Sequence, residues 1–362
     1  MNKIKMCDSH IHIEERMPID DTVSAFENMM RDNDYDRIAV LAIPSFYGYG
    51  QNYEAFYCKD RLSPKVYASA GLCHRTDADG SYYLDEIKAY YAMGCDGVKI
   101  LDGKPNCYRQ IGRRLDDKVY DRFYAFCEEK QLPVTMHIGD PAPFWDFENA
   151  TEYQKKMGWV YSAEDAPLEQ LRSEALGILE KFPKLRVIFA HFFFMAEELA
   201  RVAELFEKYE NLCLDLTPGT EMYVGFTENY DEARAFFEKY SDRIFYGTDS
   251  TNAYSRDNAR SRVTIDIVKS FMEGTKEYVD EIVDTKPLKP FGFGEDILRK
   301  IYRENFIRLY GERPRKPDYE LIAKSIPGFM SKFTPDTIEE RNLRKIEKYF
   351  AEKNNMSGYG RR

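Results

Sequence analysis

Short apolar runs alternate with longer helical patterns along most of this 362-residue chain. Each run is rich in Val, Ile or Phe and is followed by polar residues and then by apolar residues spaced i, i+3, i+4. Such alternation predicts a parallel sheet whose strands are connected by helices. Eight runs are present, at residues 5–12, 37–44, 65–74, 95–101, 132–139, 185–191, 212–217 and 244–250. Eight strands predict an α/β fold of the (β/α)8 type, the TIM barrel.

The segments between the runs predict the helices of the outer ring. Residues 173–182 and 196–209, for example, have an apolar face and a charged back. Residues 258–311 predict two further helices, separated by the Pro/Gly-rich segment 286–294, that close the barrel. The barrel is therefore expected to occupy residues 1–311.

A change in composition at Glu312 marks a C-terminal helical extension, residues 312–362. Its sequence PRKPDY predicts a linker, and residues 335–352 predict a charged helix. Residues 354–362 are too polar and rich in Gly and Ser to be expected in a fixed conformation. Barrels of this size often form dimers, and the extension is a candidate contact surface for a homodimer.

Composition narrows the classes of function. The net charge is −10 and no long Lys/Arg run is present, which disfavours nucleic acid as a partner. No stretch approaches the roughly 20 apolar residues of a membrane span, so no membrane partner is expected. The first residues lack the features of a secretory signal, and the seven cysteines are scattered without CxxC spacing. A soluble cytoplasmic protein with reduced thiols that acts on a small molecule is the expectation.

The five histidines all lie at or near the ends of predicted strands. His10 and His12 are two residues apart on the first strand, so both side chains face the barrel interior and can bind one ion. His137 ends the fifth strand, and Asp249 lies at the same level in the eighth. Active sites of such barrels lie at the carboxyl ends of the strands. These three imidazoles and one carboxylate therefore predict a site for zinc or a related divalent metal.

Lys99, His74 and His191 leave alternatives open. Lys99 lies among apolar residues on the fourth strand, so it must reach solvent, pair with a carboxylate such as Asp215, or be chemically altered. His74 stands beside Arg75 and is left out of the ligand set, because it can order the third loop instead. His191 ends the sixth strand on the same rim.

The motifs as a set resemble the amidohydrolase superfamily, in particular the amidohydrolase family 2 branch related to aminocarboxymuconate-semialdehyde decarboxylase. The resemblance covers residues 5–311 and is carried by DSHIHI, GCDGVKIL, MHIGDPAP, FPKLRVIFAHF, NLCLDLT, DRIFYGTDS and YRENFIRLYG. It implies that one ion, Zn or else Mn, is held by His10, His12, His137 and Asp249, with His191 as a catalytic base. In binuclear members a carboxylated lysine bridges two ions, and Lys99 with His137 and His191 matches that pattern too.

The resemblance implies a metal-dependent hydrolase in which Asp249 and His191 are catalytic and a metal-activated water attacks an amide, lactone or ester. Two alternatives remain: a decarboxylase of an aromatic or muconate-type acid on the same site, and a metal-binding barrel without catalysis. The loops that would select the substrate are rich in aromatic and basic residues, which suits a small carboxylated or ring-bearing compound. These loop residues are Tyr47, Tyr49, Arg75, Lys104, Tyr108, Arg109, Phe144, Trp145, Tyr223 and Tyr254. Among them Arg75, Arg109, Tyr108 and Trp145 are predicted to bind the substrate, an arginine clamping its carboxylate.

Overall fold

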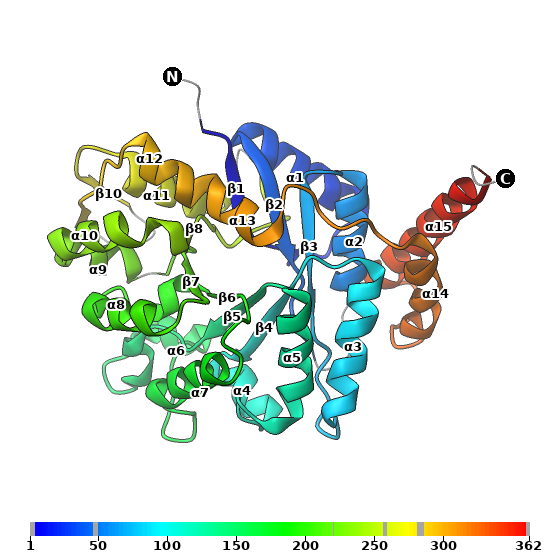
Figure 1. Ribbon diagram of the computed structural model, residues 1–362, viewed down its shortest axis with the longest axis horizontal. Coiled ribbons are helices and arrows are strands. Elements are labelled where there is room, and N and C mark those ends of the chain that lie inside the picture. The colour runs from blue at the N-terminus through cyan, green and yellow to red at the C-terminus, as the bar shows by residue number, and fades with distance from the viewer. Residues whose placement is uncertain (1–3, 46–49, 220, 256–258, 281–285, 360–362) are drawn as a thin grey trace.

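A computed structural model describes residues 4–45, 50–219, 221–255, 259–280 and 286–359. Its main sheet contains nine parallel strands in the order β8-β7-β6-β5-β4-β3-β2-β1-β9 (Figure 1). The strands are β1 Met6–His12, β2 Tyr35–Leu41, β3 Val66–Gly71, β4 Gly97–Gly103, β5 Val134–Ile138, β6 Val187–Phe189, β7 Leu212–Asp215, β8 Ile244–Phe245 and β9 Ser250–Thr251. Each predicted run overlaps at least one of these strands, and the TIM-barrel fold class is confirmed.

The predicted eighth strand, residues 244–250, is interrupted in the structure. Its first part, β8, pairs with β7, and its last part, β9, pairs with β1. Between them the backbone N–H of Ser9 donates to the carbonyl of Tyr246 at 3.0 Å, and that of Asp249 donates to the carbonyl of His10, also at 3.0 Å. Asp249 has a φ of 57°, in the left-handed region, which ends the regular strand there. This run joins the first and seventh strands and closes the barrel.

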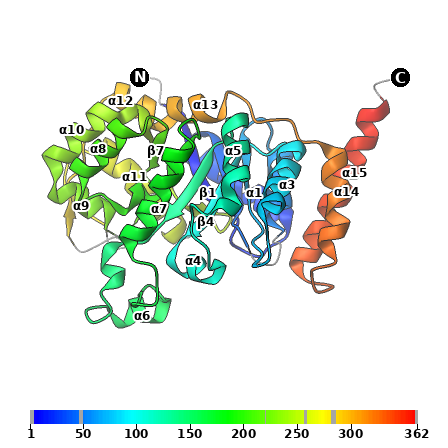
Figure 2. The same ribbon diagram turned by 60° about the horizontal axis from the view of Figure 1, so that its bottom comes forward.

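Helices surround the sheet on its outside, as Figures 1 and 2 show. They are α1 Ile19–Asp32, α2 Gln51–Arg61, α3 Gly80–Met93, α4 Pro105–Ile111, α5 Asp121–Lys130, α6 Glu152–Met157, α7 Leu168–Lys181, α8 Leu199–Lys208, α9 Met222–Glu228, α10 Tyr230–Tyr240, α11 Ala259–Glu273, α12 Glu295–Arg299, α13 Asn305–Tyr310, α14 Tyr319–Met330 and α15 Ile338–Tyr359. A π-helical turn, Lys300–Glu304, joins α12 to α13, and a short antiparallel pair, β10 Tyr278–Val279 with β11 Pro287–Leu288, follows α11. The helices predicted at 173–182 and 196–209 correspond to α7 and α8.

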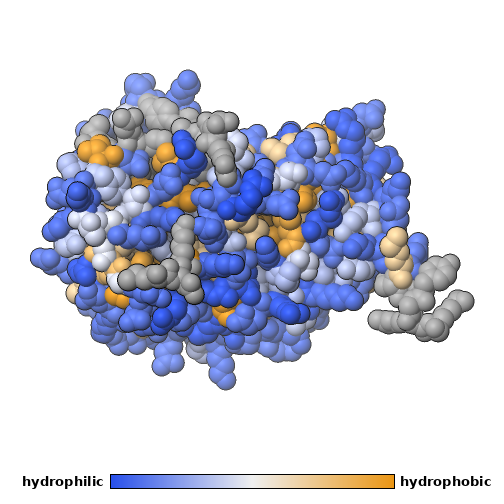
Figure 3. Space-filling model, turned by 90° about the horizontal axis from the view of Figure 1, so that it is seen from above, coloured by the Kyte–Doolittle hydropathy of each residue, from blue (hydrophilic) through white to orange (hydrophobic). Residues whose placement is uncertain are grey.

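The outer surface is polar, as expected if the helices turn their apolar faces toward the sheet. The face in Figure 3 is mostly hydrophilic, and its hydrophobic side chains form small, scattered patches. In the part of the chain that the structure describes, no helix combines the length and the apolar character needed to cross a bilayer.

The C-terminal extension forms a helical hairpin, α14 and α15, on the side of the barrel formed by α2 and α3 (Figure 1). α14 was not predicted, and it contains Pro327, a residue type that normally interrupts a helix. The prediction that residues 354–362 lack a fixed conformation is wrong for residues 354–359. α15 continues to Tyr359, because its buried Ile346 and Phe350 fix the preceding turns and each added turn extends an existing helix. Residues 360–362 lie outside the described residues.

Asn342 connects the extension to the barrel. Its side-chain oxygen accepts a hydrogen bond from the N–H of Ile19, at the start of α1, and its amide donates to Glu54 Oε1 in α2 at 2.8 Å. Burial raises the pKa of Glu54 from 4.5 to about 7, although the hydrogen bond from Asn342 lowers it. The folded state therefore binds a proton at Glu54 more tightly than the unfolded chain does.

Glu54→Gln is expected to make the protein less sensitive to rising pH. Because the folded pKa of Glu54 is raised, the wild type loses stability as pH rises from about 4.5 to about 7 and does not recover it above. The loss is on the order of 3 kcal/mol, and a neutral glutamine avoids it. Melting temperatures between pH 5 and 8 should therefore diverge in favour of the variant. Glu27→Gln, at an exposed site, is the control, and parallel curves for Glu54→Gln and the wild type would contradict the assignment.

Candidate metal centre

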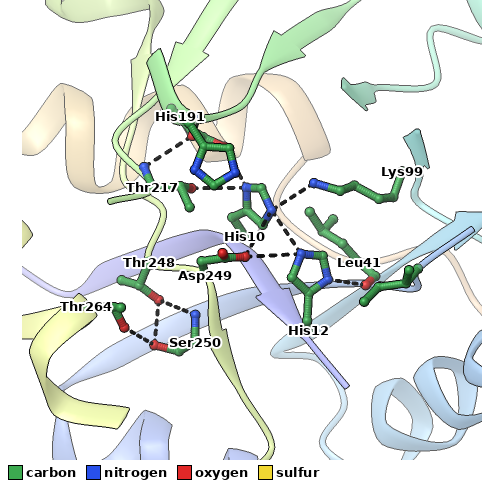
Figure 4. Close-up of polar contacts among 12 residues, drawn as sticks. His10, His12, Leu41, Lys99, His191, Thr217, Thr248, Asp249, Ser250 and Thr264 are labelled. Carbon is green, nitrogen blue, oxygen red and sulfur yellow. Dashed lines mark hydrogen bonds and ion pairs between the residues drawn. The ribbon is translucent and has the colours of Figure 1, made fainter. Parts of the chain in front are cut away.

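The two histidines of β1 lie side by side inside the barrel, with their Nε2 atoms 3.0 Å apart (Figure 4). His12 Nδ1 lies 2.7 Å from the carbonyl oxygen of Leu41, and His10 Nδ1 lies 2.8 Å from Asp215 Oδ2. A carbonyl or carboxylate oxygen only accepts, so each Nδ1 carries the proton of a neutral ring. Both Nε2 atoms therefore direct their lone pairs to the same point.

Asp249 adds a third acceptor. Its Oδ1 lies 3.3 Å from His12 Nε2 and 3.6 Å from His10 Nε2, and the ligand atoms of the three residues all lie within 4.8 Å of one another. The left-handed backbone at Asp249 places this carboxylate beside the pair instead of in the sheet. Three lone pairs directed at one point repel unless a cation lies among them, and two neutral imidazoles with one carboxylate suit a divalent ion. The residues present fit a metal.

The electrostatic environment favours the metal-binding protonation states. Burial and the nearby charge of Lys99 lower the pKa of His10 to about 4. Burial raises the pKa of Asp249, but the hydrogen bond with His12 and the electrostatic interactions with both histidines outweigh it and hold that pKa well below its ordinary value. At neutral pH His10 is therefore uncharged and Asp249 is charged, and metals bind these forms.

Lys99 does not form the salt bridge with Asp215 that was one of its three predicted alternatives. Lys99 Nζ lies 2.9 Å from His10 Nε2, and burial lowers the pKa of Lys99 to about 8. Asp215 is fully buried, and its Oδ1 accepts from the backbone N–H groups of His191 at 2.9 Å and Thr217 at 3.2 Å. With Oδ2 on His10, Asp215 fixes the orientation of the first ligand, a role that the sequence analysis missed.

Asp8 is a second buried carboxylate behind the site. Its Oδ1 accepts from the N–H of His10 at 2.9 Å, and its Oδ2 accepts from Thr248 Oγ1 at 2.7 Å. Burial raises the pKa of Asp8 to about 7, although the hydrogen bond from Thr248 lowers it. Asp8 therefore connects the strand of the histidine pair to the segment that carries Asp249.

His137 and His191 lie next to this cluster. Their ring centroids are 4.7 Å apart, and those of His191 and His10 are 5.8 Å apart. His137 Nε2 lies 3.2 Å from Asp140 Oδ1, so the structure does not bring His137 into the group formed by His10, His12 and Asp249. Asp140 lies three residues after His137 in MHIGD, and this short spacing could have indicated that the two side chains interact.

His191 begins a strained turn. His191 to Phe194 all have φ between 51° and 58°, a conformation that is rare for residues with side chains and that clusters at functional sites. Burial and, to a smaller extent, the neighbouring His137 lower the pKa of His191 to about 3. Its Nδ1 is buried and has no hydrogen-bond partner among the described residues. The turn thus presents a neutral imidazole with a free ring nitrogen beside the ligands.

The cluster opens into a cavity of about 320 Å³. The residues that line it are His10, His12, Glu14, Ile43, Lys99, Leu101, Lys104, His137, Asp140, Pro141, Phe144, Trp159, His191, Phe194, Pro218, Gly219 and Asp249. All five residues of the predicted metal and catalytic sets, and Lys99, therefore face one cavity. Its volume lies at the small end of the range for ligand pockets, which suits a small molecule.

The four residues predicted to bind substrate do not line this cavity, and that assignment is corrected. Arg75 binds Asp77 at 2.7 Å on the surface, and Arg109 binds Asp165 at 2.7 Å. The other two residues also have partners outside the cavity. Tyr108 OH donates to Glu174 Oε1 at 3.0 Å, and Trp145 Nε1 donates to the carbonyl of Ala166 at 3.2 Å. Local partners hold all four away from the cavity.

Other loop residues from the sequence analysis have varied positions. Lys104 and Phe144 line the cavity, whereas Tyr223 is buried in the core and donates to the carbonyl of Leu216. Tyr47 and Tyr49 lie outside the described residues. His74 Nε2 lies 3.0 Å from Asp102 Oδ1, away from the cluster, which agrees with its omission from the ligand set.

A (β/α)8 barrel with a His-x-His pair on its first strand and an aspartate in its closing run is the architecture of a metal-dependent barrel enzyme. The chain belongs to the amidohydrolase family: the family model described as amidohydrolase matches residues 7–311. Members of this family are enzymes that bind divalent metal. No curated protein sequence matches the chain significantly.

Solved structures support the fold. 4-Oxalomesaconate hydratase from Rhodopseudomonas palustris is similar with a TM-score of 0.55 at 12% identity, over 84% of this chain and 95% of the hydratase. 2,6-Dihydroxybenzoate decarboxylase from Rhizobium has a TM-score of 0.51 at 15% identity, over 85% and 99% of the two chains. Dihydroxybenzoic acid decarboxylase from Polaromonas sp. JS666, with bound manganese and 2-nitroresorcinol, has a TM-score of 0.51 at 14% identity, over 85% and 97%. At these identities the likeness concerns the fold alone.

Proposed function

We propose that this protein is a metal-dependent hydrolase that cleaves an amide, lactone or ester bond in a small carboxylated or ring-bearing substrate. The observation that carries the proposal is the convergence of two Nε2 atoms and one carboxylate oxygen at the base of a small cavity. His10, His12 and Asp249 would hold the ion, which we take to be zinc, and His137 is the candidate for a fourth ligand. When bound, such an ion lowers the pKa of a coordinated water from about 16 toward about 7 and polarises a substrate oxygen.

The side chains around the site have distinct roles in this proposal. Asp249 accepts the proton of the attacking water on its second carboxylate oxygen and returns it to the leaving group. His191 lines the cavity and is held neutral by burial, so its imidazole can hydrogen-bond to a polar atom of the substrate. The aromatic and proline side chains of the cavity exclude bulk water around the reacting bond.

Decarboxylation of an aromatic or muconate-type acid is the second candidate. The observation that favours it is that two of the similar solved structures are decarboxylases of dihydroxybenzoic acids. The two reactions differ in a directly measurable way. A hydrolase incorporates ¹⁸O from labelled water into its product and releases no carbon dioxide, whereas a decarboxylase releases carbon dioxide without cleaving an amide, lactone or ester.

Elemental analysis of protein purified at neutral pH, with bicarbonate and without chelators, is expected to find about one divalent ion per chain, because one three-ligand group is present among the described residues. Two ions per chain would instead indicate that Lys99 is carboxylated and bridges them. His74→Gln should retain the same metal content, since His74 pairs with Asp102 outside the cluster. No metal, even after reconstitution with zinc and manganese, would overturn the proposed function.

A further inference from the structure

One ammonium group on the cavity wall makes an ion pair but no hydrogen bond with the described residues. Lys104 immediately precedes α4, and its side chain is 31% exposed. Its Nζ lies 3.6 Å from Asp140 Oδ1, which is within the range of an ion pair and beyond that of a hydrogen bond. Asp140 is already engaged, because its Oδ1 binds His137 Nε2 and its Oδ2 accepts from Tyr161 OH. The three N–H donors of Lys104 therefore remain available to a ligand.

The other charged residues of the cavity do not take this role. Lys99 is buried against His10, and Glu14, Asp140 and Asp249 are acidic. Arg75 and Arg109 are paired with carboxylates elsewhere. Among the described residues that line the cavity, Lys104 is thus the cation that can reach an anionic group of a ligand.

Aromatic side chains form the adjoining wall. Phe144 and Trp159 lie almost parallel, with an interplanar angle of 7° and ring centroids 5.8 Å apart. Both belong to the long connection between β5 and α7, which carries α6 and projects from the barrel in Figure 2. Phe194 lies on the cavity as well, stacked on His191 at 5.1 Å. Flat rings favour a planar ligand.

The cavity size limits the ligand further. A cavity of about 320 Å³ lies at the small end of the range for ligand pockets, so it admits a small molecule such as a single substituted ring. An amphipathic planar molecule of this kind satisfies both the aromatic wall and the ammonium group of Lys104.

We infer that Lys104 is the specificity-determining residue of the site and binds the carboxylate of a small aromatic acid whose ring lies against Phe144 and Trp159. This inference rests on the proposed function for the location of the reacting bond, but the binding of the anion itself requires only the cavity. It replaces the arginine clamp that the sequence indicated.

Calorimetric binding of benzoate and of its neutral analogue benzamide tests the inference. The wild type should bind benzoate at least about tenfold more tightly than benzamide, because only the former forms a charge-assisted hydrogen bond with Lys104. Lys104→Met should lose this preference, whereas Lys104→Arg should keep most of it. Arg109→Met is the matched control and should behave as the wild type, because Arg109 lies outside the cavity.

Two results would overturn the inference: no benzoate preference in the wild type, or an undiminished preference in Lys104→Met. A melting curve for each variant checks folding, and Lys104→Gln replaces the methionine variant if that variant is unstable. Metal content measured on the same samples separates the two proposals. A Lys104-dependent preference in protein that never binds metal would retain the anion subsite and reject the hydrolase, and the reverse pattern would reject the subsite alone.

Discussion

Asp249→Asn is expected to abolish turnover of whichever substrate the hydrolase and decarboxylase screens identify, while the fold is retained. The substitution removes the charged oxygen that meets His10 and His12 and the proton acceptor proposed for the reaction. Loss of general acid–base catalysis alone lowers the rate by about 10²–10⁴-fold, and weaker metal binding adds to it. Steady-state kinetics, metal content and circular dichroism of the purified variant measure these three quantities.

Asp165→Asn is the matched control for this experiment. Asp165 is a carboxylate that pairs with Arg109 outside the cavity, so its loss should leave kcat and metal content near the wild-type values. Normal turnover in Asp249→Asn would remove the central claim about the site. Lost turnover together with a lost fold would instead identify Asp249 as a structural residue of the closing run.

Asp215→Asn is expected to weaken metal binding by about 10–100-fold, although Asp215 is not itself a ligand. The new amide oxygen can still accept from the N–H groups of His191 and Thr217, so the fold should be retained. The amide N–H₂ would face His10 Nδ1, however, and two donors cannot bond. His10 would then move its proton to Nε2, which removes the lone pair that binds the ion. Competition with a chromophoric chelator measures the change in affinity.

Thr217→Val provides the comparison for Asp215→Asn. Thr217 Oγ1 also lies 3.0 Å from His10 Nδ1, but its removal leaves the carboxylate that fixes the proton on that nitrogen. The metal affinity of this variant should stay close to that of the wild type. An unchanged affinity in Asp215→Asn would show that the tautomer of His10 does not depend on Asp215.

Most of the barrel was predictable because buried parallel strands have a recognisable sequence pattern. Apolar runs bounded by polar loops mark them, and their number identifies the barrel. The interruption at Asp249 was not predicted, because the residue types of 244–250 do not show where the sign of φ changes. α14 was also not predicted. It contains Pro327, which disfavours a helix locally, and the packing of α14 on α15 and α3 overrides that preference.

The site was predictable where strand geometry alone places a side chain. The two-residue spacing of His10 and His12 fixes their common direction, and the end of the eighth run places Asp249 at the same rim. Asp215 could be located but not assigned, because its partner depends on which atoms meet across the barrel. Arg109 was misassigned because its partner, Asp165, is 56 residues away in a connection without regular periodicity. Long loops of this kind fold by contacts that the sequence does not display.

The closure of the barrel at the metal ligands has a consequence for its unfolding. The contact between Asp8 and Thr248 joins residues separated by 240 positions, and the proposed ligands come from the same two ends of the sheet. An ion shared by His10, His12 and Asp249 therefore acts as a non-covalent crosslink between the first and last strands. In a polymer, a link across even 100 residues removes about 4–5 kcal/mol of chain entropy from the unfolded ensemble. An ion bound at the proposed ligands would therefore stabilise the contact between β1 and the closing run in addition to supplying its chemistry.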